Sequence, residues 1–390
     1  MPPTPDQSAA RLPEPGAEEI EHSNRLIEAI KSEMRAGPIS FARFMELALY
    51  APGLGYYSAG KTKFGESGDF ITAPELGNVF ARCLARQCQQ LLRELGGGDI
   101  LEAGAGSGAL AADLLAELEQ LNQLPTSYYI LEVSPDLRER QRRRIKQTVP
   151  HLLARVQWLD RFPSPGIEGV VLANELLDAM PVTLFRVSDD GIMERYVTDT
   201  EDGFGWAEQP AAAPVRERIS GFDLPSDYCS EINFTAEAWI GSAAQTLKRG
   251  VMLLFDYGFP AHEYYHPQRI GGTLMCHYRH RAHTDPLVLI GLQDITAHVD
   301  FTAIAQAAVD SGLDVLGYTA QAPFLMASGL NELMARSDAD DARTHLELTN
   351  QIKKLTLPSE MGELFKVLAL GREFDAPLLG FRVQDRRDRL

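Results

Sequence analysis

The chain has 390 residues, of which 45% are hydrophobic and 23% are charged, and its formal net charge is −17. This acidic balance disfavours nucleic acid as a partner, because phosphate backbones attract clustered lysine and arginine. No apolar run approaches the roughly 20 residues that a bilayer span requires, and four cysteines are too few for a disulfide scaffold, so we expect a cytoplasmic protein without membrane insertion.

The first 98 residues predict a tail, two helices, a long loop and a third helix. Residues 1–20 are rich in Pro, Glu and Ala, and we expect a disordered tail, since no basic start precedes an apolar segment. Helical periodicity over about 21–49, interrupted at Gly37, predicts two helices. The stretch YAPGLGYYSAGKTKFGESGDFITAPE is dense in glycine and turn residues, which predicts a loop able to act as a lid. Apolar residues on one face then predict a helix that begins at Pro74.

From residue 99 onward, strands alternate with helices, a pattern typical of a parallel sheet covered by helices. We therefore expect an α/β fold in which residues 21–98 form a helical segment with the lid loop and residues 99–390 form the core. Insertions into this core are expected at about 182–236 and 259–300, and VTLFRVSDDGIMERYV in the first of them predicts an antiparallel hairpin. The last strand, ELFKVLALG, has no crossover helix after it, so it can enter the sheet antiparallel.

The motif that carries chemistry is EAGAGSG, which follows the first of these strands. Its glycines, Gly104, Gly106 and Gly108, let the backbone approach a ligand closely, and the N-terminus of the next helix adds a favourable dipole. The second strand ends about two dozen residues later at Glu132, where a carboxylate can accept hydrogen bonds from both hydroxyls of a ribose. This arrangement predicts a nucleotide-like cofactor.

Two kinds of cofactor compete for this motif, because the same glycines also satisfy the dinucleotide fingerprint G-x-G-x-x-A. Glu102 lies two residues before the first glycine, where its charge favours a cationic methyl donor and would repel a pyrophosphate. The fourth strand ends in Asn174 and Glu175, which brings polar groups to the carboxyl edge of the sheet, where open α/β folds bind ligands. These features favour S-adenosylmethionine, held by Glu102, the three glycines, Glu132 and Asn174. An NAD(P)-dependent oxidoreductase and a non-catalytic nucleotide-binding fold are the alternatives.

Seven further segments accompany the glycine motif: LYAPGLGYYS, GESGDFITAPEL, LEVSPDLRERQ, NELLDAMPV, LLFDYGFP, GGTLMCHYRH and DITAHVDF. Together they resemble the MidA family, the mitochondrial complex I assembly-factor methyltransferases and their bacterial relatives, over about residues 37–370. The resemblance implies a class I S-adenosylmethionine methyltransferase fold, a Rossmann-like arrangement with a seven-strand, mostly parallel sheet and an antiparallel last strand. It further implies methylation of an arginine in a protein substrate, which for the mitochondrial members is a complex I subunit.

This sequence departs from the family at the glycine motif. The family's motif usually has proline between the first two glycines and a basic residue after the second, where this chain has Ala105 and Ser107. We expect cofactor binding to survive this change. Because the family's implied context is complex assembly, a chaperone-like binding protein that uses the cofactor only structurally is an alternative to an enzyme.

Acidic side chains are the candidates for holding an arginine, since carboxylates match the charge and the fork of a guanidinium. Glu175 and Asp178 are three residues apart, so a helical turn there would point both from the mouth of the fourth strand; helix capping is the structural alternative. Asp69, on the glycine-rich loop, could close over the cofactor or grip the substrate, or it could stabilise a turn. We predict these three as catalytic residues. Asp256 and Tyr257 end the fifth strand and are weaker candidates.

The segment CHYRHRAH contains His277, His280 and His283 and raises the question of a metal site. Its histidines lie in one loop with no distant second ligand pair, unlike the separated pairs of structural zinc sites. We therefore expect no metal, and we expect these residues to line the substrate cleft or to be ordinary polar loop residues. Asp300 precedes a predicted helix, where it can contribute to the site or act as the N-cap.

Overall fold

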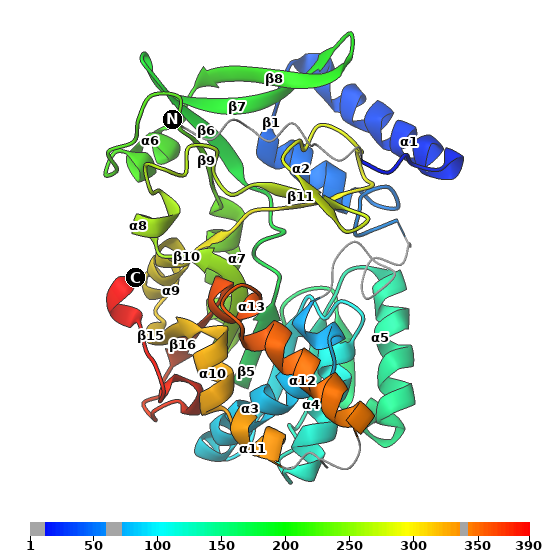
Figure 1. Ribbon diagram of the computed structural model, residues 1–390, viewed down its shortest axis with the longest axis vertical. Coiled ribbons are helices and arrows are strands. Elements are labelled where there is room, and N and C mark those ends of the chain that lie inside the picture. The colour runs from blue at the N-terminus through cyan, green and yellow to red at the C-terminus, as the bar shows by residue number, and fades with distance from the viewer. Residues whose placement is uncertain (1–11, 60–71, 336–341) are drawn as a thin grey trace.

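The computed structural model describes residues 12–59, 72–335 and 342–390. Figure 1 shows two parts, a sheet covered by helices at the bottom and a smaller part with its own strands at the top.

Seven strands form the central sheet of the lower part. In chain order they are β2 (Asp99–Ala103), β3 (Tyr128–Leu131), β4 (Val156–Leu159), β5 (Ile167–Asn174), β10 (Leu247–Phe259), β15 (Asp314–Ala320) and β16 (Phe365–Arg372). Their spatial order is β15-β16-β10-β5-β2-β3-β4, and the short strand β14 (Val299–Asp300) pairs with β10. The first five are parallel, whereas β16 is antiparallel to both β10 and β15. The predicted mostly parallel, seven-strand sheet with an antiparallel last strand is therefore confirmed.

Helices cover both faces of this sheet. On one face lie α3 (Val79–Leu95), α4 (Ala109–Gln120), α5 (Pro135–Thr148), α10 (Gln321–Ala327), α11 (Leu330–Ala335), α12 (Ala342–Thr356) and α13 (Met361–Leu364), and on the other α7 (Phe234–Thr246) and α9 (Phe301–Asp310). In β5, Val170 and Leu172 join the apolar cluster of the first face, while Val171 and Ala173 join that of the second. Burial on both faces explains why the strand is almost continuously apolar.

Helix α3 begins later than predicted. Pro74 lies in a separate 3-10 turn, Ala73–Glu75, and the helix itself begins at Val79. Gly77 lies between the two with a φ of +139°, a conformation that interrupts a right-handed helix.

The tail was predicted to extend to residue 20, but helix α1 (Ala17–Glu33) already begins at Ala17. Glu19 accepts a hydrogen bond of 2.8 Å from the backbone amide of Gly16, as the acidic residue of a capping box does. Acidic residues in this first turn also favour the helix dipole. Within the described ranges, no helix has the length and the apolar character needed to cross a bilayer.

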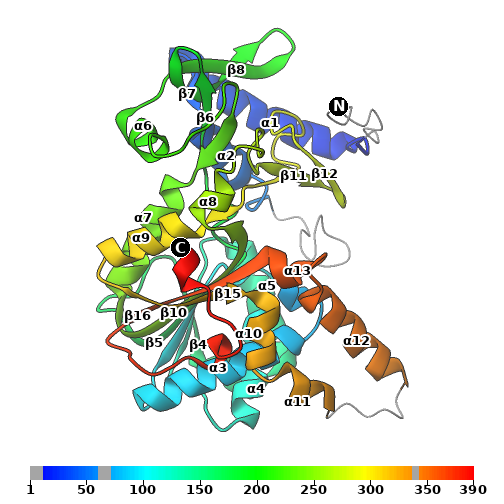
Figure 2. The same cartoon turned by 60° about the vertical axis from the view of Figure 1, so that its left-hand side comes forward.

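The upper part combines the N-terminal helices with both insertions. Its elements are α1, β1 (Ile39–Ser40), α2 (Phe41–Tyr50), β6 (Thr183–Ser188), β7 (Gly191–Thr200), β8 (Gly203–Pro210), α6 (Ala213–Ile219), β9 (Cys229–Ile232), α8 (Ala261–Tyr264), β11 (Met275–Tyr278), β12 (Arg281–His283) and β13 (Asp294–Thr296). Strands β1, β7, β6 and β9, with β8 beside β7, form an antiparallel sheet, which confirms the predicted hairpin. Phe41, Val197 and Ile290 share one buried cluster. Figure 2 shows this part lying above the central sheet.

Candidate active site

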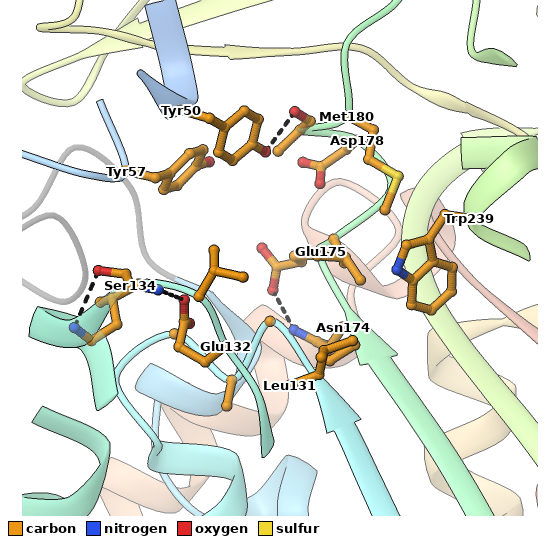
Figure 3. A pocket seen from close by; sticks show the side chains of 18 of the residues that line it. Tyr50, Tyr57, Leu131, Glu132, Ser134, Asn174, Glu175, Asp178, Met180 and Trp239 are labelled. Atoms are coloured by element: carbon orange, nitrogen blue, oxygen red, sulfur yellow. Dashed lines mark hydrogen bonds between the residues drawn. The ribbon is translucent and has the colours of Figure 1, made fainter. Parts of the chain in front are cut away.

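A cavity of about 780 Å³ lies where the ends of β2, β3 and β5 meet residues from α2 and the segment that follows it (Figure 3). Strands β2 and β5 are neighbours, and β3 lies on the other side of β2, so the strand order reverses here. Open α/β sheets bind their ligands at such a point. The predicted residues that line the cavity are Glu102, Gly104, Gly106, Glu132, Asn174, Glu175 and Asp178.

Three glycines shape the turn after β2, and all have left-handed backbones, with φ of 70° at Gly104, 51° at Gly106 and 83° at Gly108. Other residues rarely adopt this region. A Cβ on Gly104 would lie 2.8 Å from the end of the Leu176 side chain, so Leu176 would have to move to admit another residue there. Gly108 is the N-cap of α4 and does not line the cavity. A Cβ there would lie 2.9 Å from the backbone of Gln141 in α5, so Gly108 supports the turn through helix packing.

Glu132 follows β3 and lies at the lower side of the cavity in Figure 3. Its Oε1 accepts a hydrogen bond of 2.8 Å from the backbone amide of Ser134, and its Oε2 accepts one of 3.2 Å from Nε2 of Gln141. The carboxylate is only 8% exposed, and burial raises its pKa. The two bonds fix the orientation that a ribose-binding carboxylate at this strand end requires.

Glu102 lies in β2, buried beneath the glycine turn. The hydroxyl of Tyr128 donates a hydrogen bond of 2.6 Å to its Oε2. Burial raises the pKa of Glu102 to about 7, although the bond from Tyr128 lowers it in part. The carboxyl group is therefore near its titration point at neutral pH, and a cation bound close to it would favour the charged form.

Glu175 follows β5 directly, and its backbone is left-handed, with a φ of 50°. The expected helical turn does not begin at Glu175, because its backbone is left-handed. A bend at Glu175 is followed by a short turn at Asp178 and Ala179. Glu175 and Asp178 nevertheless line the same cavity. Oε1 of Glu175 accepts hydrogen bonds of 3.2 Å from the amide of Ala73 and 3.0 Å from Nδ2 of Asn174. Burial, with a contribution from nearby Asp178, raises the pKa of Glu175 to about 8.

The turn that carries Asp178 is held by several neighbours. Oδ2 of Asp256 accepts hydrogen bonds of 2.9 and 3.3 Å from the amides of Leu177 and Asp178. The amide of Ala297 donates to the carbonyl oxygen of Asp178 at 2.9 Å, and Nδ2 of Asn233 donates to that of Leu177 at 2.9 Å. Burial raises the pKa of Asp178 to about 6. Asp256 is buried and does not line the cavity, so it positions this turn.

The cavity is also lined by three aromatic side chains that were not predicted from the sequence. These are Tyr50, Tyr57 and Trp239. Tyr50 ends α2, Tyr57 follows it, and Trp239 lies in α7. For the tyrosines, the available signal is their density in LYAPGLGYYS. Trp239 lies on a helix after the first insertion, and no local pattern marks it as a site residue.

Of the remaining predicted residues, those that the structure describes do not line this cavity. Asp69 lies outside the described residues. His277 and His283 belong to strands β11 and β12 of a hairpin and His280 to its turn, and none of them lines the cavity. In the parts of the chain that the structure describes, no three His, Cys, Asp or Glu side chains are grouped to hold a metal ion. Asp300 acts as the N-cap of α9, since its side chain accepts hydrogen bonds from two amides of the first turn.

Comparison with known proteins identifies a family and several proteins to which this chain is similar. Residues 83–319 match the family described as "Putative S-adenosyl-L-methionine-dependent methyltransferase". A crystal structure of a Burkholderia thailandensis protein bound to S-adenosyl-homocysteine is 46% identical with a TM-score of 0.95, and the match covers 97% of this chain and 100% of that chain. The mitochondrial protein arginine methyltransferase NDUFAF7 of Homo sapiens is 29% identical over 88% of this chain and 82% of its own length. Its Drosophila melanogaster homolog is 28% identical over 86% and 82%.

The cavity fits S-adenosylmethionine better than a dinucleotide. Glu102 and Glu132 both line it, where their carboxylates could pair with a cation and a ribose, and Oδ1 of Asn174 is buried without a hydrogen-bond partner among the described residues. Arg43 is the one lysine or arginine among the described lining residues, and it already pairs with Glu33, so a pyrophosphate would find little compensating charge. The match over 83–319 and the likeness to a complex with S-adenosyl-homocysteine confirm the cofactor and the family resemblance predicted from the sequence. The chain therefore belongs to this family of S-adenosyl-L-methionine-dependent methyltransferases.

Proposed function

We propose that this protein transfers a methyl group from S-adenosylmethionine to an arginine side chain of a protein substrate in the cytoplasm, and that a subunit of respiratory complex I is the first substrate to test. The observation that carries the proposal is the pair of acids, Glu175 and Asp178, in the same cavity as the glycine turn. Carboxylates match both the charge and the planar donors of a guanidinium. The names of the curated relatives, protein arginine methyltransferases, support the same substrate class.

In this proposal the donor is held by Glu102, Gly104, Gly106, Glu132 and Asn174. The bound donor supplies an activated methyl group. The chain contributes mainly alignment, which is worth up to about 7–11 kcal/mol in well-oriented reactions. The bonds that hold Glu132 and the turn after β5 in place support such alignment.

The nitrogen that receives a methyl group must also lose a proton. Glu175 is suited to accept it, because a pKa of about 8 lies near the working pH, as an effective general base requires. Its Oε1 already accepts hydrogen bonds from Ala73 and Asn174, so we assign the proton transfer to Oε2. Asp178, with a pKa of about 6, is mostly ionised at neutral pH and would hold the guanidinium.

Labelled methyl transfer tests the proposal. Purified protein and methyl-labelled S-adenosylmethionine are added to an extract of cells that lack the gene, and labelled proteins are identified by mass spectrometry. We expect methylarginine on one or a few proteins, with S-adenosylhomocysteine formed over many turnovers. Glu175→Gln should keep donor binding and lose transfer by about 10²–10⁴-fold. Glu168→Gln, which alters an exposed acid near the start of the same strand, is the matched control.

Two results would contradict the proposal. Label found only on lysine or on small molecules would assign another substrate class. Donor binding without multiple turnovers would instead indicate a binding protein that uses the cofactor structurally.

A further inference from the structure

We propose that Tyr50 and Tyr57 form an aromatic wall that makes this cavity select a flat, delocalised cation such as guanidinium over a compact ammonium ion. The inference rests on the proposed function in one respect, that the methyl acceptor is cationic. Figure 3 shows the two rings across the open space from Glu132, with Asp178 beside Tyr50 and Glu175 below Asp178, at the border of the same space. The wall comes from α2 and the residues after it, whereas the acids come from the core.

Ring contacts and hydrogen bonds hold the two rings in place. Tyr50 and Tyr57 stack with centroids 5.5 Å apart and planes inclined by 22°, and Tyr56 packs edge-on against Tyr57 at 5.0 Å. The hydroxyl of Tyr50 donates a hydrogen bond of 2.8 Å to the carbonyl oxygen of Ala179. The hydroxyl of Tyr57 donates one of 2.8 Å to Oδ1 of Asp294. Burial raises the pKa of both tyrosines well above the usual range, so both hydroxyls stay protonated as donors.

The bond to Ala179 links the wall to the acids. Ala179 directly follows Asp178, so Tyr50 is tied to the same turn that presents this carboxylate. The turn is itself fixed by Asp256. One hydrogen bond therefore joins the aromatic surface to the turn that carries the carboxylate, an arrangement that favours a preformed site.

This combination suits a guanidinium for geometric reasons. A guanidinium can place a face against an aromatic ring while its N–H groups point in the plane toward carboxylates such as Glu175 and Asp178. An ammonium ion is a compact, strongly hydrated point charge and gains less from a ring face. Removing one ring of the wall should therefore reduce binding of the planar cation by about tenfold, as expected for a partly desolvated cation–π contact.

Titration with two small cations tests the wall directly. Ethylguanidinium and propylammonium are titrated by NMR into the protein saturated with S-adenosylhomocysteine, at pH 8.5, where Glu175 is mostly ionised. The wild-type protein should bind ethylguanidinium about tenfold more tightly than propylammonium. Tyr50→Leu and Tyr57→Leu should each remove most of this preference. Tyr50→Phe keeps the ring and should retain the preference within about threefold.

Affinity for S-adenosylhomocysteine, measured by calorimetry in each variant, shows whether the cavity is intact. The proposal is overturned if the wild-type protein does not prefer ethylguanidinium, or if both leucine variants keep this preference. It is also overturned if the leucine variants lose affinity for both cations by the same factor. The preference for ethylguanidinium could disappear in the leucine variants while no methylarginine forms in the extract. This result would overturn the proposed function but would support the role of the aromatic wall in cation selection.

Discussion

Asp256 accepts a hydrogen bond of 2.9 Å from the backbone amide of Leu177, and this bond joins β10 to the turn that carries Asp178. Asp256 is 1% exposed, and burial, with nearby Asp178 and Glu175, raises its pKa well above the usual range. Placing a third acid behind two others is electrostatically costly. The amides of the turn offset part of this cost, and the turn gains a fixed position.

Asp256→Ala should therefore impair transfer more than donor binding. Loss of the acceptor frees the amides of Leu177 and Asp178 and lets the turn move, and a displacement of about 1 Å can cost about 100-fold in rate. We expect kcat to fall by about that factor while affinity for S-adenosylhomocysteine changes less than threefold. Asp256→Asn keeps one acceptor oxygen and should lose less. An equal loss of donor affinity would mean that Asp256 supports the whole cavity.

Gly104→Val should abolish donor binding. The position has a φ of 70°, which strains a β-branched residue, and a Cβ there would lie 2.8 Å from the end of the Leu176 side chain. Because Gly104 lines the cavity, we expect the valine side chain to occupy space that the donor needs. We expect affinity for S-adenosylhomocysteine by calorimetry to fall more than about 100-fold, an amount equal to about 2.7 kcal/mol. Gly221→Val is the control, because nothing lies within 4 Å of a Cβ at that site. Undiminished binding by the Gly104 variant would refute the assignment of the donor site.

The predicted residues that line the cavity lie at the C-terminal ends of core strands or in the short segments that follow them. Glu132 and Asn174 follow from strand periodicity and chain order alone, because parallel strands bring their carboxyl ends to one edge. Tyr50 could not be found this way, since its hydrogen bond to Ala179 spans 129 residues and joins two parts of the fold. Sequence spacing also predicts the wrong backbone at Glu175, because a left-handed residue after a strand has no periodic signal.

Binding of the donor should weaken as pH falls through about 7. The pKa of Glu102 is raised to about 7, mainly by burial, so the carboxylate that we propose as the partner of the cationic donor is progressively neutralised below that value. We expect affinity for S-adenosylmethionine to decrease several-fold between pH 8 and pH 6. Glu102→Gln should have low affinity at pH 8 and no such slope. Tyr128→Phe removes the bond that favours the ionised form and should shift the midpoint to higher pH; an unchanged midpoint would contradict this role.

Glu175 should lower the stability of the unliganded protein at alkaline pH. Its folded-state pKa of about 8 exceeds the ordinary value of 4.5, so the folded state binds the proton more tightly than the unfolded state. The contribution of Glu175 to stability is therefore fully favourable below about pH 4.5 and is lost as pH rises through 8. Glu175→Gln removes this dependence. We expect the variant to melt at least about 2 °C above the wild type at pH 9 and at nearly the same temperature at pH 5, measured by calorimetry without donor. Glu168→Gln should show no such difference, and a Glu175→Gln effect independent of pH would mean that the buried carboxyl is not the cause.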